Sequence, residues 1–176
     1  DIYIWMDSEK DWQKTCWQIV AEKSTDLNIM KTVIQRLVGN SKYDFAHEVI
    51  GKLRGTTGKK DFYSLEMGTF FGMHMAFEKS IREYMVHLKY NPKRWQTISD
   101  RIMAFPDYSE VLNQTKTILD DSELPQAKFI LADLLFKLKN YDQLLELEDP
   151  IFIVEDILVD NSFSMRFISY YWYLPS

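Results

Sequence analysis

The 176-residue sequence is poor in cysteine, glycine and proline, and it has no long apolar run. A single cysteine, Cys16, excludes an intrachain disulfide framework and any cysteine-based zinc cluster. Between Thr15 and Trp17, such a residue is typical of a small buried hydrophobe rather than a reactive thiol. Because no run of about 18 apolar residues is present, we expect no helix that spans a membrane.

Basic residues are also scattered, with 21 Lys and Arg against 26 Asp and Glu and a net charge of -5. A nucleic-acid-binding surface needs basic residues concentrated on one face, so this class of function is disfavoured. The chain begins at Asp1 with no signal-peptide pattern, and we expect a mature form or an excised fragment. We expect a soluble chain, with the cytoplasm slightly favoured over other compartments.

Apolar residues, by contrast, make up 46% of the chain and aromatic residues 15%, which is enough to bury a sizeable core. Their spacing of three or four residues predicts helices. The clearest runs are Met30, Val33, Ile34, Leu37 and Val38, and then Leu131, Leu134, Leu135 and Leu138. Strand-like alternation occurs only in DIYIWM, at 1–6, which is too short to form a sheet. The sequence therefore predicts an all-α fold.

An aromatic residue recurs at the start of alternate predicted helices. These residues are Tyr43, Phe77, Tyr108 and Tyr141, which are separated by 34, 31 and 33 residues. Three residues after each aromatic comes a small or aliphatic side chain, namely Ala46, Ser80, Val111 and Leu144. A period near 34 with two helices in each unit is typical of tetratricopeptide repeats.

The second unit resembles this family most closely. A tetratricopeptide unit has a small residue where its two helices touch and an aromatic residue that opens the second helix. Gly68 and Phe77 take these two positions here. Phe71, Ser80, Tyr84 and Pro92 also match within this unit, as do Trp95 in the third unit and Ala132 in the fourth. The pattern departs from the family at Ile34, where a small residue is expected, and at Pro106, in the turn of the third unit.

The resemblance implies a right-handed α-solenoid, in which helix pairs stack because neither helix of a pair buries its apolar face alone. The four units would be about 27–58, 59–92, 93–124 and 125–150, after an N-terminal flanking segment, 1–26, with a capping helix at 8–23. A break at Asp149-Pro150 would shorten the second helix of the fourth unit. Residues 151–176 would be an irregular helical cap or the start of a continuation.

The stretch GKLRGTTGKKD, residues 51–61, could be a phosphate-binding loop or a connection between helices. A P-loop needs a glycine five residues before Gly58 and a hydroxyl residue after Lys59, but Leu53 and Lys60 stand there. Glycine is also a common stop signal after a helix. We therefore expect GTTGKK to be the loop between the first two units and not a nucleotide site.

No catalytic or metal-binding motif is found in the sequence. His47, His74 and His87 lack the four-residue spacing of a helical metal site, so we expect them to pack or lie at the surface. Cys16 has no evident histidine partner, and there is no Gly-x-Ser-x-Gly elbow. The methionines of the second unit, Met67, Met73, Met75 and Met85, are expected to fill the core, with an adaptable binding surface as the alternative. We expect no enzymatic activity, no cofactor and no metal.

The resemblance implies that the first helix of each unit lines a concave groove, which binds a peptide or a helix of a partner protein. The candidate lining residues are Asn28, Lys31, Gln35, Phe62, Leu65, Thr69, Gln96, Asp100, Met103, Phe129, Asp133 and Phe136. Some tetratricopeptide domains hold a chaperone C-terminus with a lysine–asparagine clamp, and that pattern is missing here. Phe62, Phe129 and Phe136 instead indicate an apolar peptide, an amphipathic helix or another part of the same polypeptide.

The expected function is therefore that of a non-enzymatic protein–protein interaction scaffold. The alternative is a regulatory or structural block of a larger protein or enzyme whose catalytic part lies outside this chain. An exposed aromatic surface at residues 170–173 would favour the alternative, whereas aromatic side chains packed on the last unit would favour the scaffold. Self-association through the same aromatic end is a third possibility.

Overall fold

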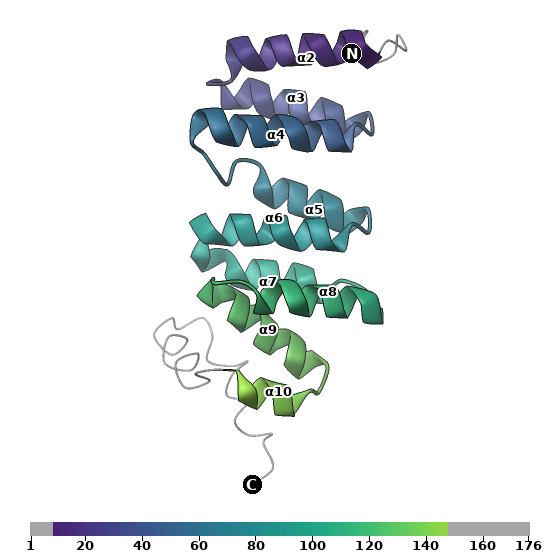
Figure 1. Cartoon of the computed structure of the whole chain (residues 1–176), viewed down its shortest axis with the longest axis vertical. Coiled ribbons are helices and arrows are strands. Elements are labelled where there is room, and N and C mark those ends of the chain that lie inside the picture. Colours follow the sequence, from purple (N-terminus) through teal and green to yellow (C-terminus); the bar gives the residue numbers. More distant parts are fainter. Residues whose placement is uncertain (1–8, 148–176) are drawn as a thin grey trace. The chain divides into compact units, whose positions relative to one another are not determined.

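The computed structural model describes residues 9–147 (Figure 1). Every regular element within this range is helical, and the predicted all-α class is confirmed for it. The chain divides into two compact units, Asp1–Pro92 and Lys93–Ser176, and each is described by itself. The cap expected at 151–176, the break at Asp149-Pro150 and the aromatic end at 170–173 lie outside the described residues.

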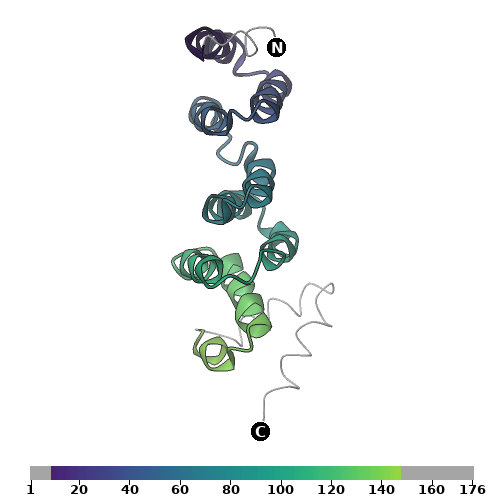
Figure 2. The same cartoon turned by 90° about the vertical axis from the view of Figure 1, so that its right-hand side faces the viewer.

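The first unit contains α2 (Glu9–Lys23), α3 (Leu27–Gly39), α4 (Tyr43–Thr57), α5 (Ser64–Met73) and α6 (Phe77–Tyr90). Within this unit, α2, α4 and α6 form one row and α3 and α5 form a second row (Figure 2). The helix expected near 8–23 corresponds to α2. The ranges 27–58 and 59–92 hold the pairs α3–α4 and α5–α6, respectively.

The second unit contains α7 (Trp95–Met103), α8 (Ser109–Asp120), α9 (Pro125–Lys137) and α10 (Tyr141–Glu146), and the short helix η1 (Pro92–Arg94) precedes them. Pro125 occupies the first turn of α9, where its missing N–H costs no hydrogen bond. The ranges 93–124 and 125–150 hold α7–α8 and α9–α10, as far as the description reaches.

Three of the helix pairs are closed by the same type of turn. A residue in the left-handed region ends the first helix, and the next N–H donates to a carbonyl five residues earlier, as in a Schellman motif. The turns lie at Ser41 (φ 59°), Met75 (φ 58°) and Lys139 (φ 55°), and the closing bonds are Lys42 to Leu37, Ala76 to Phe71 and Asn140 to Leu135, each 2.9 Å long. The α7–α8 turn contains Pro106, which has no N–H to make this bond.

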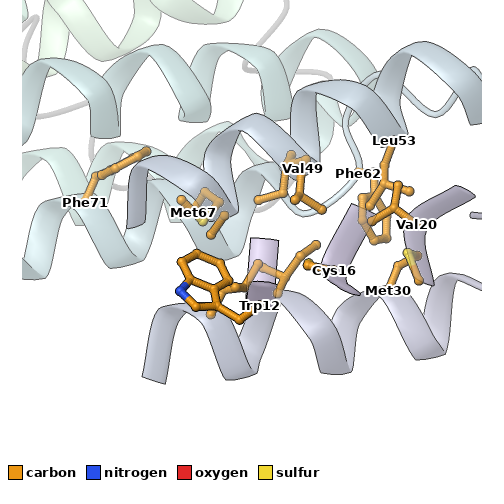
Figure 3. Packing of buried hydrophobic residues seen from close by; sticks show 13 residues of the cluster. Trp12, Cys16, Val20, Met30, Val49, Leu53, Phe62, Met67 and Phe71 are labelled. Carbon is orange, nitrogen blue, oxygen red and sulfur yellow. The ribbon is translucent and has the colours of Figure 1, made fainter. Parts of the chain in front are cut away.

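The core of the first unit forms where α2 covers the first helix pair. Trp12, Cys16 and Val20, spaced one turn apart on α2, are buried in a hydrophobic cluster that extends to Phe71 (Figure 3). Phe45 of α4 meets the ring of Trp12 edge-on, with the ring centroids 4.9 Å apart. The apolar stripe of α2 is therefore covered by the pair that follows it.

The close helix contact expected at Gly68 is confirmed. The hydroxyl of Ser80 on α6 donates to the carbonyl oxygen of Gly68 on α5, at 2.6 Å. A Cβ atom on Gly68 would lie 2.5 Å from two ring carbons of Tyr84. Only a residue without a side chain allows α5 and α6 to approach this closely.

The expectation that all of GTTGKK is a loop is wrong in part, because α4 continues through Thr57. The hydroxyl of Thr57 donates to the carbonyl of Leu53 at 2.6 Å, and Leu53 is fully buried. Burial of the apolar stripe keeps the helix intact through Gly55, although glycine destabilises a helix by about 1 kcal/mol relative to alanine. The helix ends at Gly58, which has a left-handed φ of 72°.

In the second unit, α7 and α9 lie side by side and run in the same direction. Three contacts are spread along their length, and each joins one residue of α7 to the residue of α9 that lies 34 positions later in the sequence. They are Trp95 with Phe129 (centroids 5.2 Å apart), Ser99 with Asp133 (2.6 Å between oxygens) and the Met103 carbonyl with the Lys137 ammonium (3.1 Å). The contacts between α7 and α9 therefore share a register of 34 residues.

Candidate binding surfaces

The exposed side of α3 carries three of the candidate groove residues. Asn28, Lys31 and Gln35 are exposed and spaced three and four residues apart, so they share one side of the helix. The opposite side is buried through Met30 and Ile34. A shallow, open depression of about 460 Å³ lies beside Asn28 and is lined by 25–28. The side of α3 away from the core is therefore a polar, accessible surface.

The α5 candidates are less accessible. Leu65 and Thr69 are half-buried, and the Thr69 hydroxyl donates to the Leu65 carbonyl at 2.8 Å. Phe62, which the sequence assigned to the groove, precedes α5 and lies in the core with 7% of its surface exposed. Its position beside Leu53 and Val20 is seen in Figure 3. A partner at the surface could touch little of Phe62, so the aromatic lining expected in this unit is absent at that position.

Tyr63 was not predicted but lies between the two first helices of this unit. It has a left-handed φ of 62° and immediately precedes α5. Burial and the negative charge of Glu66 raise the pKa of Tyr63, while a hydrogen bond with Gln35 acts to lower it. The phenol therefore stays neutral at physiological pH and links α3 to α5. The sequence gives no sign of this, because 28 residues separate Gln35 and Tyr63.

The second unit provides a more apolar candidate surface. On α7, Asp100 is exposed while Gln96 and Met103 are half-buried. On α9, Phe129 and Phe136 are half-buried, and Asp133 is buried, with 9% exposed. Phe129 packs on Trp95 of α7, and Asp133 accepts a hydrogen bond from the Ser99 hydroxyl of α7. Phe136 packs on Tyr141 of α10, with the ring centroids 6.0 Å apart. Part of the predicted α9 lining thus serves the packing of neighbouring helices.

A buried ionic cluster joins α4 to α6. Glu83 is 5% exposed and accepts hydrogen bonds from Arg54, with Nη1 at 3.1 Å and Nη2 at 2.6 Å. His47 Nε2 lies 3.1 Å from the same carboxylate. Burial acts to raise the pKa of Glu83, but the hydrogen bonds and positive charges of His47 and Arg54 outweigh it and leave the pKa below its ordinary value. The third Arg54 nitrogen, Nε, donates to the Phe62 carbonyl at 3.0 Å. Because each guanidinium nitrogen makes a hydrogen bond within the fold, we interpret the cluster as structural.

The other titratable candidates also have packing partners. Burial raises the pKa of Cys16 to about 11, so it is an unreactive thiol at neutral pH. His87 Nδ1 lies 3.4 Å from the Ser64 hydroxyl, and His74 is the C-cap of α5. Across residues 9–147, no three His, Cys, Asp or Glu side chains are grouped closely enough to hold a metal ion.

The methionines of the second predicted unit do not all fill the core. Met67 is fully buried, but Met73 and Met75 are 76% and 78% exposed. They lie at and just beyond the end of α5, in the turn to α6. The prediction of core packing is therefore wrong for these two residues.

No family model, curated protein or solved structure matches this chain. Within the described part of the chain, none of the helices combines the length and the apolar character needed to cross a bilayer.

Proposed function

We propose that this chain is a tetratricopeptide-like interaction scaffold, whose helix pairs stack as a right-handed solenoid and whose first helices bind a peptide or helix of a partner protein. The proposal assigns recognition to two surfaces. One is the polar side of α3 with Asn28, Lys31 and Gln35. The other is the apolar strip around Trp95, Phe129 and Met103 on α7 and α9.

Repetition of local geometry supports the architecture. The turns at Ser41 and Met75 are 34 residues apart and share the same φ and closing bond, and α7 contacts α9 in a 34-residue register. A repeat whose equivalent helices lie in parallel leaves one edge of each first helix without a covering element.

The exposed side of α3 is one of the two surfaces proposed to bind the partner. Its three side chains form a stripe about two turns long, which matches the i, i+3, i+7 spacing through which helices meet extended or helical ligands. Lys31 is the only charged member and would favour an acidic side chain or a carboxylate on the ligand. The half-buried aromatic residues of α7 and α9 would favour apolar anchors.

The test begins with a random peptide library displayed on phage and selected against the full chain. Selected peptides are then titrated against three double-alanine variants, at Asn28 and Lys31 on α3, at Gln96 and Met103 on α7, and at the exposed Glu48 and Lys52 on α4 as a matched control. Loss of a contacting side chain costs about 1 kcal/mol or more, roughly a fivefold rise in Kd.

We expect at least one first-helix variant to raise the Kd by about fivefold or more, while the α4 control leaves it unchanged. An equal or larger effect of the α4 control would place binding on the second helices and contradict the proposal. Failure to select any peptide that the unaltered chain binds would contradict it as well.

A further inference from the structure

The turn between α5 and α6 presents two thioethers to solvent. Met73 and Met75 are the most exposed large hydrophobic side chains in the described part of the chain; the next, Tyr108, is 67% exposed. Methionine normally fills gaps in a core, where burial stabilises it. Two such side chains in solvent on either side of one histidine therefore need a different explanation from packing.

The histidine between them is held in a fixed orientation. The ring of His74 stacks on Phe70, with centroids 4.1 Å apart, and contacts Tyr43 at 5.0 Å. Its Nδ1 lies 2.9 Å from the Phe70 carbonyl oxygen. Because a carbonyl can only accept, Nδ1 carries the proton, and Nε2 has the lone pair in the neutral ring.

This lone pair is only weakly engaged. Nε2 is 3.4 Å from the hydroxyl oxygen of Tyr43, and this hydroxyl also donates to the Ser41 hydroxyl oxygen, 3.1 Å away. A histidine that donates from Nδ1 to a backbone carbonyl and keeps Nε2 as an acceptor has the arrangement seen in metal-ligating histidines. The hydrogen bond to the Phe70 carbonyl would thus fix the orientation of the His74 ring as a metal ligand.

The backbone keeps the three side chains together. Met75 has a left-handed φ of 58°, and its N–H donates to Gly72 at 3.2 Å, so the chain reverses at this point. Consecutive Cα atoms are about 3.8 Å apart, which limits the Cα atoms of Met73 and Met75 to about 7.6 Å. The two long, flexible thioether side chains therefore start from backbone positions on either side of His74 and at most about 7.6 Å apart.

We propose that Met73, His74 and Met75 form a binding site for a soft monovalent cation, Cu(I) or its analogue Ag(I). Thioether sulfur is a soft ligand that selects Cu(I) over Mg²⁺, Ca²⁺ and Mn²⁺, and imidazole is compatible with the same ion. All three ligands are neutral, and an uncompensated charge costs less for a monovalent ion than for a divalent one. The site does not depend on the proposed peptide-binding function.

The test uses the full chain with ¹³C-labelled methionine methyl groups, titrated with Ag(I) in chloride-free buffer and observed by NMR. Met73→Leu and Met75→Leu assign the two signals, and Met85→Leu is the matched control. Since both altered positions are exposed, the variants should fold, and circular dichroism checks this. The His74 ring is followed through its ¹⁵N signals, and Mg²⁺ is titrated as the hard-ion comparison.

We expect the Met73 and Met75 signals and His74 Nε2 to shift together and saturate at one equivalent. The double variant Met73→Leu/Met75→Leu should weaken this event by at least about tenfold, about 1.4 kcal/mol, whereas Met85→Leu leaves it intact. Shifts spread evenly over all methionines, shifts that persist in the double variant, or an equal response to Mg²⁺ would each overturn the assignment.

Discussion

Replacing Gly68 by alanine tests the helix contact on which the repeat assignment depends. Alanine normally stabilises a helix by about 1 kcal/mol relative to glycine. At Gly68, the new Cβ would lie 2.5 Å from Cδ1 and Cε1 of Tyr84 and 3.2 Å from the Ser80 carbonyl oxygen. Unstrained carbon atoms are about 3.5–4.0 Å apart, so the ring would have to move by about 1 Å.

Tyr84 has little room to move, because only 2% of its surface is exposed. Overpacking of this kind costs about 1–3 kcal/mol. The same substitution at Gly51 and Gly55 provides the matched control, since both lie within α4 and a Cβ there would meet nothing within 4 Å. We expect Gly51→Ala and Gly55→Ala to stabilise the protein by about 0.5–1 kcal/mol each.

The free energy of unfolding, from urea denaturation followed by far-ultraviolet circular dichroism, measures these changes. Gly68→Ala should be about 1–3 kcal/mol less stable than the two controls. If Gly68→Ala stabilised the protein as much as Gly51→Ala, then α5 and α6 would not be as close as described.

Three further predictions concern the buried ionic cluster and the turns. Glu83→Gln should lower the free energy of unfolding by about 3–5 kcal/mol near neutral pH, because Arg54 would stay buried without its counter-charge; an effect below about 1 kcal/mol, as for a surface ion pair, would show that the pair is exposed. The lowered pKa of Glu83 means that its contribution is full above the ordinary pKa, about 4.3, and is lost as pH falls through the lowered value. The stability difference between the wild type and Glu83→Gln, measured by denaturation across the acidic range, should therefore narrow on acidification; a constant difference would contradict the shift. Ser41→Gly and Lys139→Gly should each stabilise by about 1 kcal/mol by relieving left-handed strain, and a loss of stability in both would contradict the turn geometry.

Helical periodicity and one small residue were sufficient to predict much of the fold. The apolar spacing in 30–38 correctly predicted α3, and Gly68 correctly located the contact between α5 and α6. Both predictions depend on near neighbours in the sequence, because helical spacing and close helix contact are set within one unit.

Features that depend on long-range contacts were missed. Glycine and threonine at 55–57 indicated a loop, but burial of Leu53 extends the helix through them. Phe62 was assigned to the groove because apolar spacing does not locate the start of α5 to within a turn. The helix begins at Ser64, so Phe62 precedes it. Arg54 and His47 meet Glu83 across 29 and 36 residues, and no local pattern pairs them.

Site-specific photo-cross-linking tests the proposed function most directly. A benzophenone amino acid is placed at Gln35, on the exposed side of α3, and in a second protein at Glu48, on the exposed side of α4. Both are irradiated with a peptide selected from the random library for binding to the full chain. If the peptide uses the α3 surface, Gln35 should cross-link to it and Glu48 should not; for a peptide whose affinity depends on the α7 residues, Gln96 replaces Gln35. Cross-linking at Glu48 without cross-linking at either first-helix position would contradict the account.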